Sequence, residues 1–202
     1  MTSKVGRLPV RLLSIVGLSL LVVAVRMPIS FAQTPPEVHI VDFGEYVVDH
    51  ETGTIDPKFI IKTLNPVRTS VEPTFISHTN RIEIRPCRRF GISFDARSAS
   101  PNDPARLTIR VTHPLMVRPD GASGEVETWQ SPTDLKGSFA GYSFNYAWEM
   151  VPGTWTFSLL FADQVLAEQQ FELFETSGPP TMPRGGCSEV ISSYQSQPVQ
   201  RL

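Results

Sequence analysis

Large apolar side chains recur at every second position between Tyr142 and Phe174, and this alternation constrains the fold more than any other feature of the sequence. The Pro152-Gly153 break separates two sets of such residues, and within each set the members lie two positions apart. They are Tyr142, Phe144, Tyr146 and Trp148 before the break, and Trp155, Phe157, Leu159 and Phe161 after it. Side chains two residues apart on a strand point to the same face of a sheet. The segment therefore predicts strands with one buried aromatic face, and Trp155 is expected in the core.

The alternation also predicts the register of the last hairpin. A two-residue turn would place acidic side chains of the final strand on the buried face. A three-residue connection, Ala162 to Gln164, instead pairs Trp155 with Phe171 and Leu159 with Ala167. Because a shift of one residue turns every side chain to the other face, burial decides the register. We therefore expect the three-residue connection, with one residue in the left-handed region.

The rest of the chain contains further strand patterns separated by proline and glycine. They lie at residues 38–48, 82–94 and 106–113, with an ambiguous stretch at 58–77 and one short strand within a long loop at 126–129. The His113-Pro114 pair is expected to end the strand at 106–113. The sequence therefore predicts an all-β domain at residues 37–175, an antiparallel immunoglobulin-like β-sandwich of about seven or eight strands. A small closed barrel is the alternative.

The first 32 residues have the pattern of a secretory signal peptide. Basic residues come first, an apolar run of fourteen follows from Leu12 to Val25, and Ser30-Phe31-Ala32 supplies small residues for cleavage. An uncleaved membrane anchor is the alternative, but a spanning helix needs about 20 apolar residues. We therefore expect cleavage after Ala32, a periplasmic or secreted protein, and no membrane span once the signal is removed.

The C-terminal residues and the net charge further limit the extent of the folded domain and the class of partner. Residues 176–202 lack periodicity and are rich in Pro, Gly, Ser and Gln, which predicts a disordered tail. Without residues 1–32, the chain has 14 basic and 20 acidic side chains, a net charge of −6. This acidic balance argues against nucleic acid as a partner.

Several short segments resemble one protein family. They are RIEIRPCRRFGISF (81–94), VTHPLM (111–116), YSFNYAWEMVPGTWTFSL (142–159) and VLAEQQF (165–171). Together they resemble the bacterial domain of unknown function 3859, a family of exported proteins, over residues 37–174. The resemblance implies an exported β-rich domain and implies no activity.

Cys87 and Cys187 are the only cysteines of the chain. Export would place them in an oxidising compartment, where an even number of cysteines is usually paired. We therefore predict a disulfide that ties the tail to the domain. Two free thiols are the alternative.

The candidate ligand-binding residues are four arginines and one tryptophan. Arg81, Arg85, Arg88 and Arg89 form a local basic cluster that can bind a carboxylate, a phosphate or an anionic glycan. Exposed charges that discourage pairing of a strand edge are the alternative explanation. Trp129 lies in a predicted loop and is the candidate for an exposed aromatic contact.

The sequence contains no catalytic or metal-binding motif. His39, His50, His78 and His113 have no ligand-like spacing, so neither a metal nor another cofactor is expected. No serine lies in a nucleophile motif. We therefore expect a non-catalytic binding or envelope-assembly module, whose partner is an envelope protein or an anionic ligand. The alternative is a hydrolase that acts on an envelope polymer, which should show a concave site with a perturbed ionisable group.

Overall fold

The computed structural model describes residues 34–48, 51–70, 73–98, 106–132, 138–176, 182–183 and 187. The chain divides into two compact units, Met1–Gln33 and Thr34–Leu202, and every described residue belongs to the second. The predicted signal peptide lies outside the described residues, as does most of the predicted tail. Among the described residues, no helix has the length and apolar character needed to cross a membrane.

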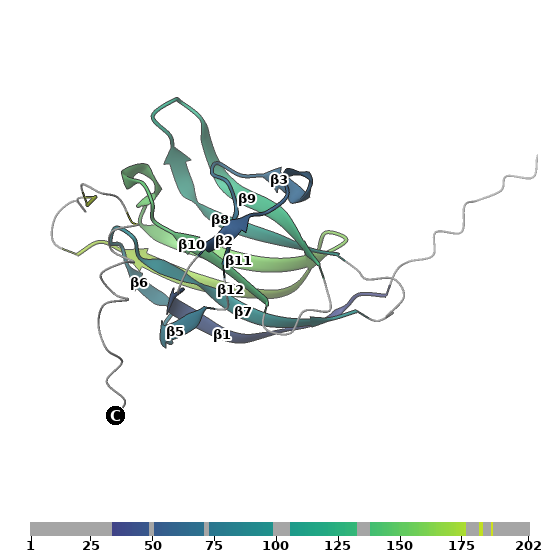
Figure 1. Cartoon of the computed structure of the whole chain (residues 1–202). Helices are drawn as coiled ribbons and strands as arrows, with labels where there is room; N and C mark the ends of the chain where they lie inside the picture. The colour runs from purple at the N-terminus through teal and green to yellow at the C-terminus, as the bar shows by residue number, and fades with distance from the viewer. Residues whose placement is uncertain are drawn as a thin grey trace, which may run out of the picture. The chain divides into compact units, whose positions relative to one another are not determined.

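Two sheets form most of the described domain (Figure 1). The larger has the order β3 (Ile60–Lys62), β9 (Ser123–Pro132), β8 (Arg106–Val117), β11 (Gly153–Phe161), β12 (Gln164–Phe174), β6 (Arg81–Glu83). The smaller has the order β10 (Ser138–Ser143), β7 (Arg89–Arg97), β1 (Glu37–Val47), β5 (Thr74–Ser77). A separate pair joins β2 (Glu51–Thr54) and β4 (Arg68–Ser70), and two 3₁₀ helices are η1 (Pro57–Phe59) and η2 (Ala147–Glu149). The pairings between described strands are antiparallel, except that β6 runs parallel to β12.

The core lies between the two sheets and is largely aromatic. Phe90 of β7 contacts Trp155 of β11 and Phe171 of β12, with ring centroids 5.6 and 5.3 Å apart. Trp155 is fully buried, at 0% exposure, as the alternation predicts. The antiparallel β-sandwich predicted from the sequence is therefore confirmed.

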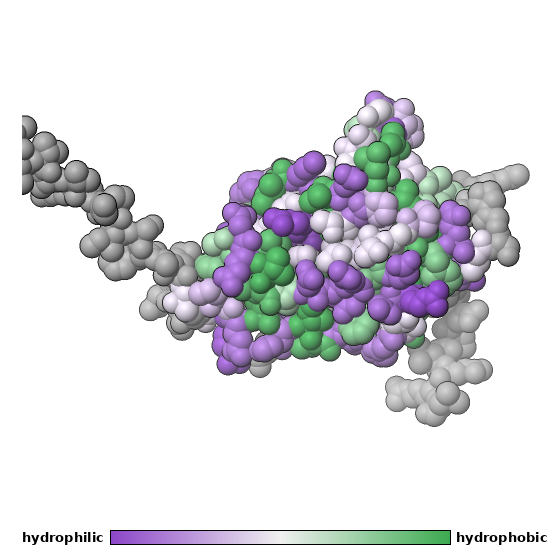
Figure 2. Space-filling model, turned by 180° about the vertical axis from the view of Figure 1, so that it is seen from behind, coloured by the Kyte–Doolittle hydropathy of each residue, from purple (hydrophilic) through white to green (hydrophobic). Residues whose placement is uncertain are grey.

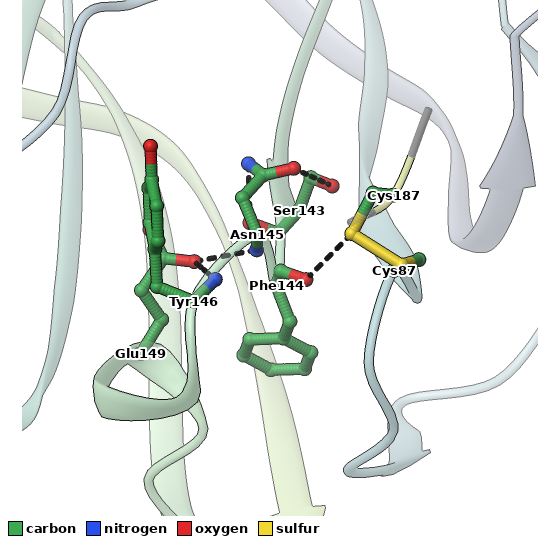
Figure 3. Close-up of a disulfide and its surroundings, with 7 residues drawn as sticks. All are labelled: Cys87, Ser143, Phe144, Asn145, Tyr146, Glu149 and Cys187. Carbon is green, nitrogen blue, oxygen red and sulfur yellow. Dashed lines mark hydrogen bonds between the residues drawn. A yellow bond between two sulfur atoms is a disulfide. The ribbon is translucent and has the colours of Figure 1, made fainter. Parts of the chain in front are cut away.

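The chain passes from one sheet to the other at Pro86-Cys87. β6 ends just before this pair in the larger sheet, and β7 begins just after it in the smaller sheet. Cys87 has a φ of 65°, in the left-handed region, so the backbone turns sharply there. Cys87 and Cys187 form a disulfide with their Cα atoms 5.1 Å apart (Figure 3), which confirms the predicted pairing.

The predicted register of the last hairpin is confirmed, but the predicted loop is wrong. Trp155 pairs with Phe171 and Leu159 with Ala167, as expected. Beyond Leu159 the pairing shifts, and Phe161 lies opposite Gln164. The hairpin therefore has a two-residue turn, Ala162-Asp163, with both residues at positive φ, and a bulge restores the register that buries the aromatic face.

Three other expectations about strands are wrong. β8 does not end at His113-Pro114 but continues to Val117, because its pairing with β9 shifts between Thr112 and Met116 and so tolerates the proline. β9 has ten residues, where we expected a short strand inside a loop. The alternation after Tyr142 does not continue as a strand, because β10 ends at Ser143 and Tyr146 precedes η2.

The surface of the described domain carries separate apolar side chains. Those with large exposed areas are Val41, Ile61, Ile76, Leu115, Val117, Tyr146 and Val165. Figure 2 shows one face, where apolar areas lie in several patches among hydrophilic ones. Scattered exposure of this kind is ordinary for a folded protein.

Candidate functional site

A pocket of about 520 Å³ lies beside β10, the edge strand of the smaller sheet. Its floor comes from β8 and β9 of the larger sheet, and the opposite wall from residues 139–143 of β10. Residues of the segments 46–48, 55–67 and 145–149, together with Arg89, complete the lining. The pocket therefore lies at one side of the sandwich. There, inward-facing side chains of β9 border both the core and the cavity.

Glu127 occupies an inward-facing position of β9, where an apolar residue is expected. It pairs with Val111 of β8, and two residues later Trp129 pairs with Ile109. Because side chains two apart share a face, Glu127 points to the interior together with Trp129. It is only 5% exposed and borders the pocket. A charged residue at such a position breaks the local pattern, and such exceptions are expected at functional sites.

The carboxyl group of Glu127 is incompletely hydrogen-bonded. The backbone amide of Leu64 donates to it. No described group donates a hydrogen bond to its Oε1 atom, although that atom is buried. The pKa of Glu127 is raised to about 7, chiefly by burial and to a smaller extent by the negative charge of Glu149, in spite of the Leu64 hydrogen bond.

Glu149 is the second acid of the pocket, and its carboxylate is held firmly. Its Oε2 atom accepts from the backbone amides of Asn145 and Tyr146 at 2.6 and 2.8 Å. The side-chain amide of Asn65 donates to its Oε1 atom, and Tyr142 is a further hydrogen-bonding neighbour. Glu149 is 1% exposed, and burial raises its pKa to about 7 in spite of these donors.

Tyr142 connects the two acids to the core. Its hydroxyl donates to the sulfur of Met116 at 3.6 Å, and its ring lies against Trp155 with centroids 4.8 Å apart. Burial raises the pKa of Tyr142, and the charges of Glu127 and Glu149 raise it further. The phenol therefore stays protonated and remains a hydrogen-bond donor beside the carboxylates.

Aromatic rings and a few charges form the remaining walls. Phe59, Trp129, Phe139 and Tyr146 border the pocket, as do Arg89 and Asp56. An apolar lining with a few convergent polar groups is the usual composition of a small-molecule site. The pocket is therefore suited to a ligand with a compact apolar body and a hydrogen-bond donor.

The disulfide supports the segment that holds Glu149. The Cys87 amide donates to the carbonyl oxygen of Phe144 at 2.9 Å, and the Phe144 amide donates to the carbonyl oxygen of Arg88 at 3.1 Å. Figure 3 shows the segment from Phe144 to Tyr146 passing between the disulfide on one side and Glu149 on the other. The covalent bond therefore fixes the backbone whose amides bind the carboxylate.

The four arginines of the sequence cluster do not form one surface. Arg81 is exposed and lies over the ring of Phe174, with its guanidinium carbon 5.0 Å from the ring centroid. Arg85, exposed beyond the end of β6, pairs with Glu83 at 2.5 Å. Arg88 pairs with Glu45 at 2.6 Å, and Arg89 is buried at the pocket. The change of sheets at Pro86-Cys87 separates them, and ligand binding by the arginines stays a prediction.

The expectation that Trp129 is exposed is wrong. Trp129 is only 8% exposed, because it lies inside β9 with Ile109 on one side and Ile60 of β3 on the other. The same residue does border the pocket. Its contact with a ligand would therefore be made from the interior wall and not from a loop.

Neither glutamate was predicted from the sequence as a functional residue. Glu127 lies in the short strand expected at 126–129, whose Trp129 was expected to be exposed, and Glu149 follows the predicted aromatic strand. One signal was present: Glu127 and Trp129 share a parity, so burial of one implies burial of the other. No signal in the sequence brings Glu149 to Glu127, because 21 residues and a change of sheet separate them.

His113 is a buried histidine outside the pocket. Its ring lies against Trp155 with centroids 4.8 Å apart, and burial lowers its pKa. Its Nδ1 atom lies 2.8 Å from the carbonyl oxygen of Pro114, whereas its Nε2 atom has no partner among the described residues. Across the described part of the chain, no three His, Cys, Asp or Glu side chains gather as a metal site would require.

Comparisons with known proteins identify the family and leave the activity open. A family described as a domain of unknown function (DUF3859) matches residues 55–173, which include most of the pocket. No curated protein matches the chain. The chain is similar to the crystal structure of an immunoglobulin-like protein from Pseudomonas aeruginosa, with 19% identity and a TM-score of 0.47 over 71% of this chain and 99% of that one.

Proposed function

Because the chain belongs to the family of the domain of unknown function DUF3859, its function must be argued from its own site, and we propose that it is a non-catalytic binding module of the cell envelope. Its ligand occupies the pocket between β9 and β10. The signal-peptide pattern and the disulfide both support an exported protein, since disulfides persist in oxidising compartments.

The unpartnered oxygen of Glu127 carries this proposal. A buried polar atom without a hydrogen bond costs about 1–3 kcal/mol. This atom belongs to a residue that borders the pocket. A ligand that donates to it would remove the deficit. The site is therefore incomplete in the free protein and complete with a ligand.

The proposal is tested with a variant that fills the pocket. Ser131 is a partly exposed residue of the lining and shares the inward parity of Glu127 and Trp129, so Ser131→Trp narrows the cavity. Ser123→Trp makes the same change at an exposed position of β9 and is the matched control. Ligand-observed NMR would use four probes: benzylamine, benzyl alcohol, benzoate and methyl β-D-glucopyranoside.

We expect at least one probe to bind the wild-type protein and the Ser123→Trp control and to lose binding to Ser131→Trp. Circular dichroism would show that both variants fold. The proposal is wrong if no probe binds, or if filling the pocket leaves the binding of every probe unchanged.

A hydrolase acting on an envelope polymer is the second candidate, and two acids with a pKa of about 7 in one pocket favour it. Acid–base catalysis, however, uses pairs whose environments separate their pKa values. Here burial raises the pKa of both carboxyls in the same direction, and Glu149 is engaged by two backbone amides. Release of soluble fragments from peptidoglycan, lost in Glu127→Gln, would establish the hydrolase and overturn the non-catalytic module.

The four arginines give weaker support for a ligand site than the residues of the pocket do. Arg85 and Arg88 form ion pairs with Glu83 and Glu45, and these pairs compete with an anionic ligand. An envelope protein or anion as the partner therefore has less support than a donor-bearing ligand of the pocket.

A further inference from the structure

We infer that the ligand of the pocket is a cation, a primary ammonium or guanidinium group that donates to Glu127, with Glu149 as the second negative charge. This inference rests on the proposed function, because it names the chemistry of the group that the pocket binds. Two observations carry it: two buried carboxylates border one cavity, and one of their oxygens has no donor among the described residues.

The charges around the cavity favour a cation. Glu127 and Glu149 are buried, and the charge of Glu149 acts on Glu127. Of the other charged residues in the lining, Asp56 is exposed and already pairs with Lys58 at 2.6 Å, while Arg89 is engaged in interactions of its own. Burial of two like charges is unfavourable, and a cation placed between them offsets both the burial and the repulsion.

The rim of the pocket already holds cations on an aromatic ring. The Lys58 ammonium lies 4.8 Å from the Phe59 ring centroid, and the Arg106 guanidinium carbon lies 4.3 Å from it. Both cations are exposed, so solvent and salt screen their repulsion for an incoming cation. The inner rings, Trp129 and Tyr146 among them, offer further faces for cation–π contact.

A neutral ligand explains the site less completely. A hydroxyl group can donate to the Glu127 oxygen, but it carries no positive charge that would favour the ionised form of either acid. An ammonium group has three donors and a guanidinium has five, so either can serve Glu127 and a neighbouring acceptor at the same time. The charge therefore distinguishes the cation from a sugar or an alcohol.

Cation binding should depend on pH through the two acids. Both acids have raised pKa values of about 7, so both are largely protonated below this value in the free protein. A bound cation favours the carboxylates and releases protons. The other groups that face them are Tyr142, whose raised pKa keeps it protonated, Asp56, whose pKa is lowered by its hydrogen bond with Lys58, and Arg89. Affinity should therefore increase as the pH rises from about 5 to about 8.

The test compares benzylamine with benzyl alcohol, which has the same ring and a neutral donor. Isothermal titration calorimetry would measure both at about pH 5 and pH 8 with the wild-type protein, Glu127→Gln and Glu125→Gln. Glu125 is an exposed acid of the same strand, so Glu125→Gln removes the same charge outside the pocket and is the matched control.

We expect benzylamine to bind the wild-type protein and Glu125→Gln at least about tenfold more tightly at pH 8 than at pH 5, with release of protons. Glu127→Gln should weaken benzylamine by about tenfold or more at pH 8 and leave benzyl alcohol unchanged. The cation is excluded if Glu127→Gln leaves benzylamine affinity unchanged, if the alcohol binds as tightly, or if benzylamine does not bind.

The probes also separate this inference from the proposed function. If benzyl alcohol, benzoate or the glucoside binds in a way that Ser131→Trp abolishes, while benzylamine does not bind, the pocket is a binding site and the cation is wrong. If none of the four probes binds, both proposals fail.

Discussion

The aromatic core and the pocket lie in the same interior between the sheets but are built on opposite principles. In the core, Trp155 contacts Phe90 and Phe144 with ring centroids 5.6 and 6.0 Å apart, and its polar neighbours, His113 and Tyr142, also meet it with their rings. At the pocket, the inward position next to Trp129 holds Glu127, whose buried oxygen lacks a donor. An inward-facing position therefore does not guarantee an apolar side chain where a cavity interrupts the packing.

The difference shows where stability comes from and where it is lost. Burial of apolar area contributes about 25 cal/mol per Å², so the fully covered rings stabilise the fold. Burial of a carboxyl opposes folding whenever the group must ionise. Substitutions in the two regions should therefore change the free energy of unfolding in opposite directions.

The largest loss is expected from Trp155→Ala. Trp155 is fully buried, and truncation of a buried tryptophan costs about 3–5 kcal/mol. Urea unfolding followed by circular dichroism measures this loss. Val165→Ala, at an exposed position of the partner strand β12, is the control and should change stability by less than about 0.5 kcal/mol. Equal stability of the two variants would contradict a core organised around Trp155.

The second loss is expected when the Cys87–Cys187 disulfide is removed. The bond closes a loop with a sequence separation of 100 residues, and disulfides typically contribute about 2–4 kcal/mol. The double variant Cys87→Ser/Cys187→Ser should unfold at lower urea concentration than the oxidised wild-type protein. Reductant should destabilise the wild-type protein to the same level and leave the double variant unchanged. A reductant-insensitive wild-type protein would show that the bond does not support the Phe144 segment.

The core was predictable from the sequence because its signal is local. Alternation identified β11, the burial of Trp155 and the pairing of Trp155 with Phe171. The disulfide was also predictable, since only two cysteines exist. The position of Pro114 within β8 was not, because a shift in strand pairing lets the strand continue through a proline.

The pocket was not predictable, because it depends on how distant segments meet. Glu127 from β9, Glu149 from η2 and Asn65 from a loop come together only when the sheets have packed. The four arginines lie on both sides of the change of sheets at Pro86-Cys87, and ligand binding by them stays a prediction. The pocket residues, in contrast, are brought together by spatial and not by sequence proximity.

In the pocket, Glu127→Gln should increase stability at pH 8. The folded pKa of about 7 lies above the ordinary value of 4.5, so the folded protein holds a proton that the unfolded chain releases between these values. Stability from this group is therefore present at low pH and decreases as the pH rises through about 7. Glutamine does not ionise, and we expect a gain of about 1–3 kcal/mol at pH 8 and a small change at pH 5.

Urea unfolding at both pH values measures this gain, with Glu125→Gln as the control for a lost surface charge. The exposed acids Glu37, Asp56 and Glu83 have lowered pKa values and titrate below this window, so they do not obscure it. A destabilised Glu127→Gln at pH 8 would show that the carboxylate stabilises the fold, and the contrast between core and pocket would disappear.

The smallest change in stability is expected from a substitution in the turn of the β11–β12 hairpin. This substitution tests whether burial of the aromatic face or the geometry of the turn fixes the register of the two strands. Ala162 has a φ of 46°, a conformation that glycine adopts more easily than alanine. Ala162→Gly removes this strain but increases the entropy of the unfolded chain, so stability should change by less than about 1 kcal/mol. If burial of the aromatic face fixes the register, the Trp155–Phe171 pairing persists, and NOEs across these strands would show it. A shifted pairing in Ala162→Gly would mean that the turn, and not the core, determines how the two strands align.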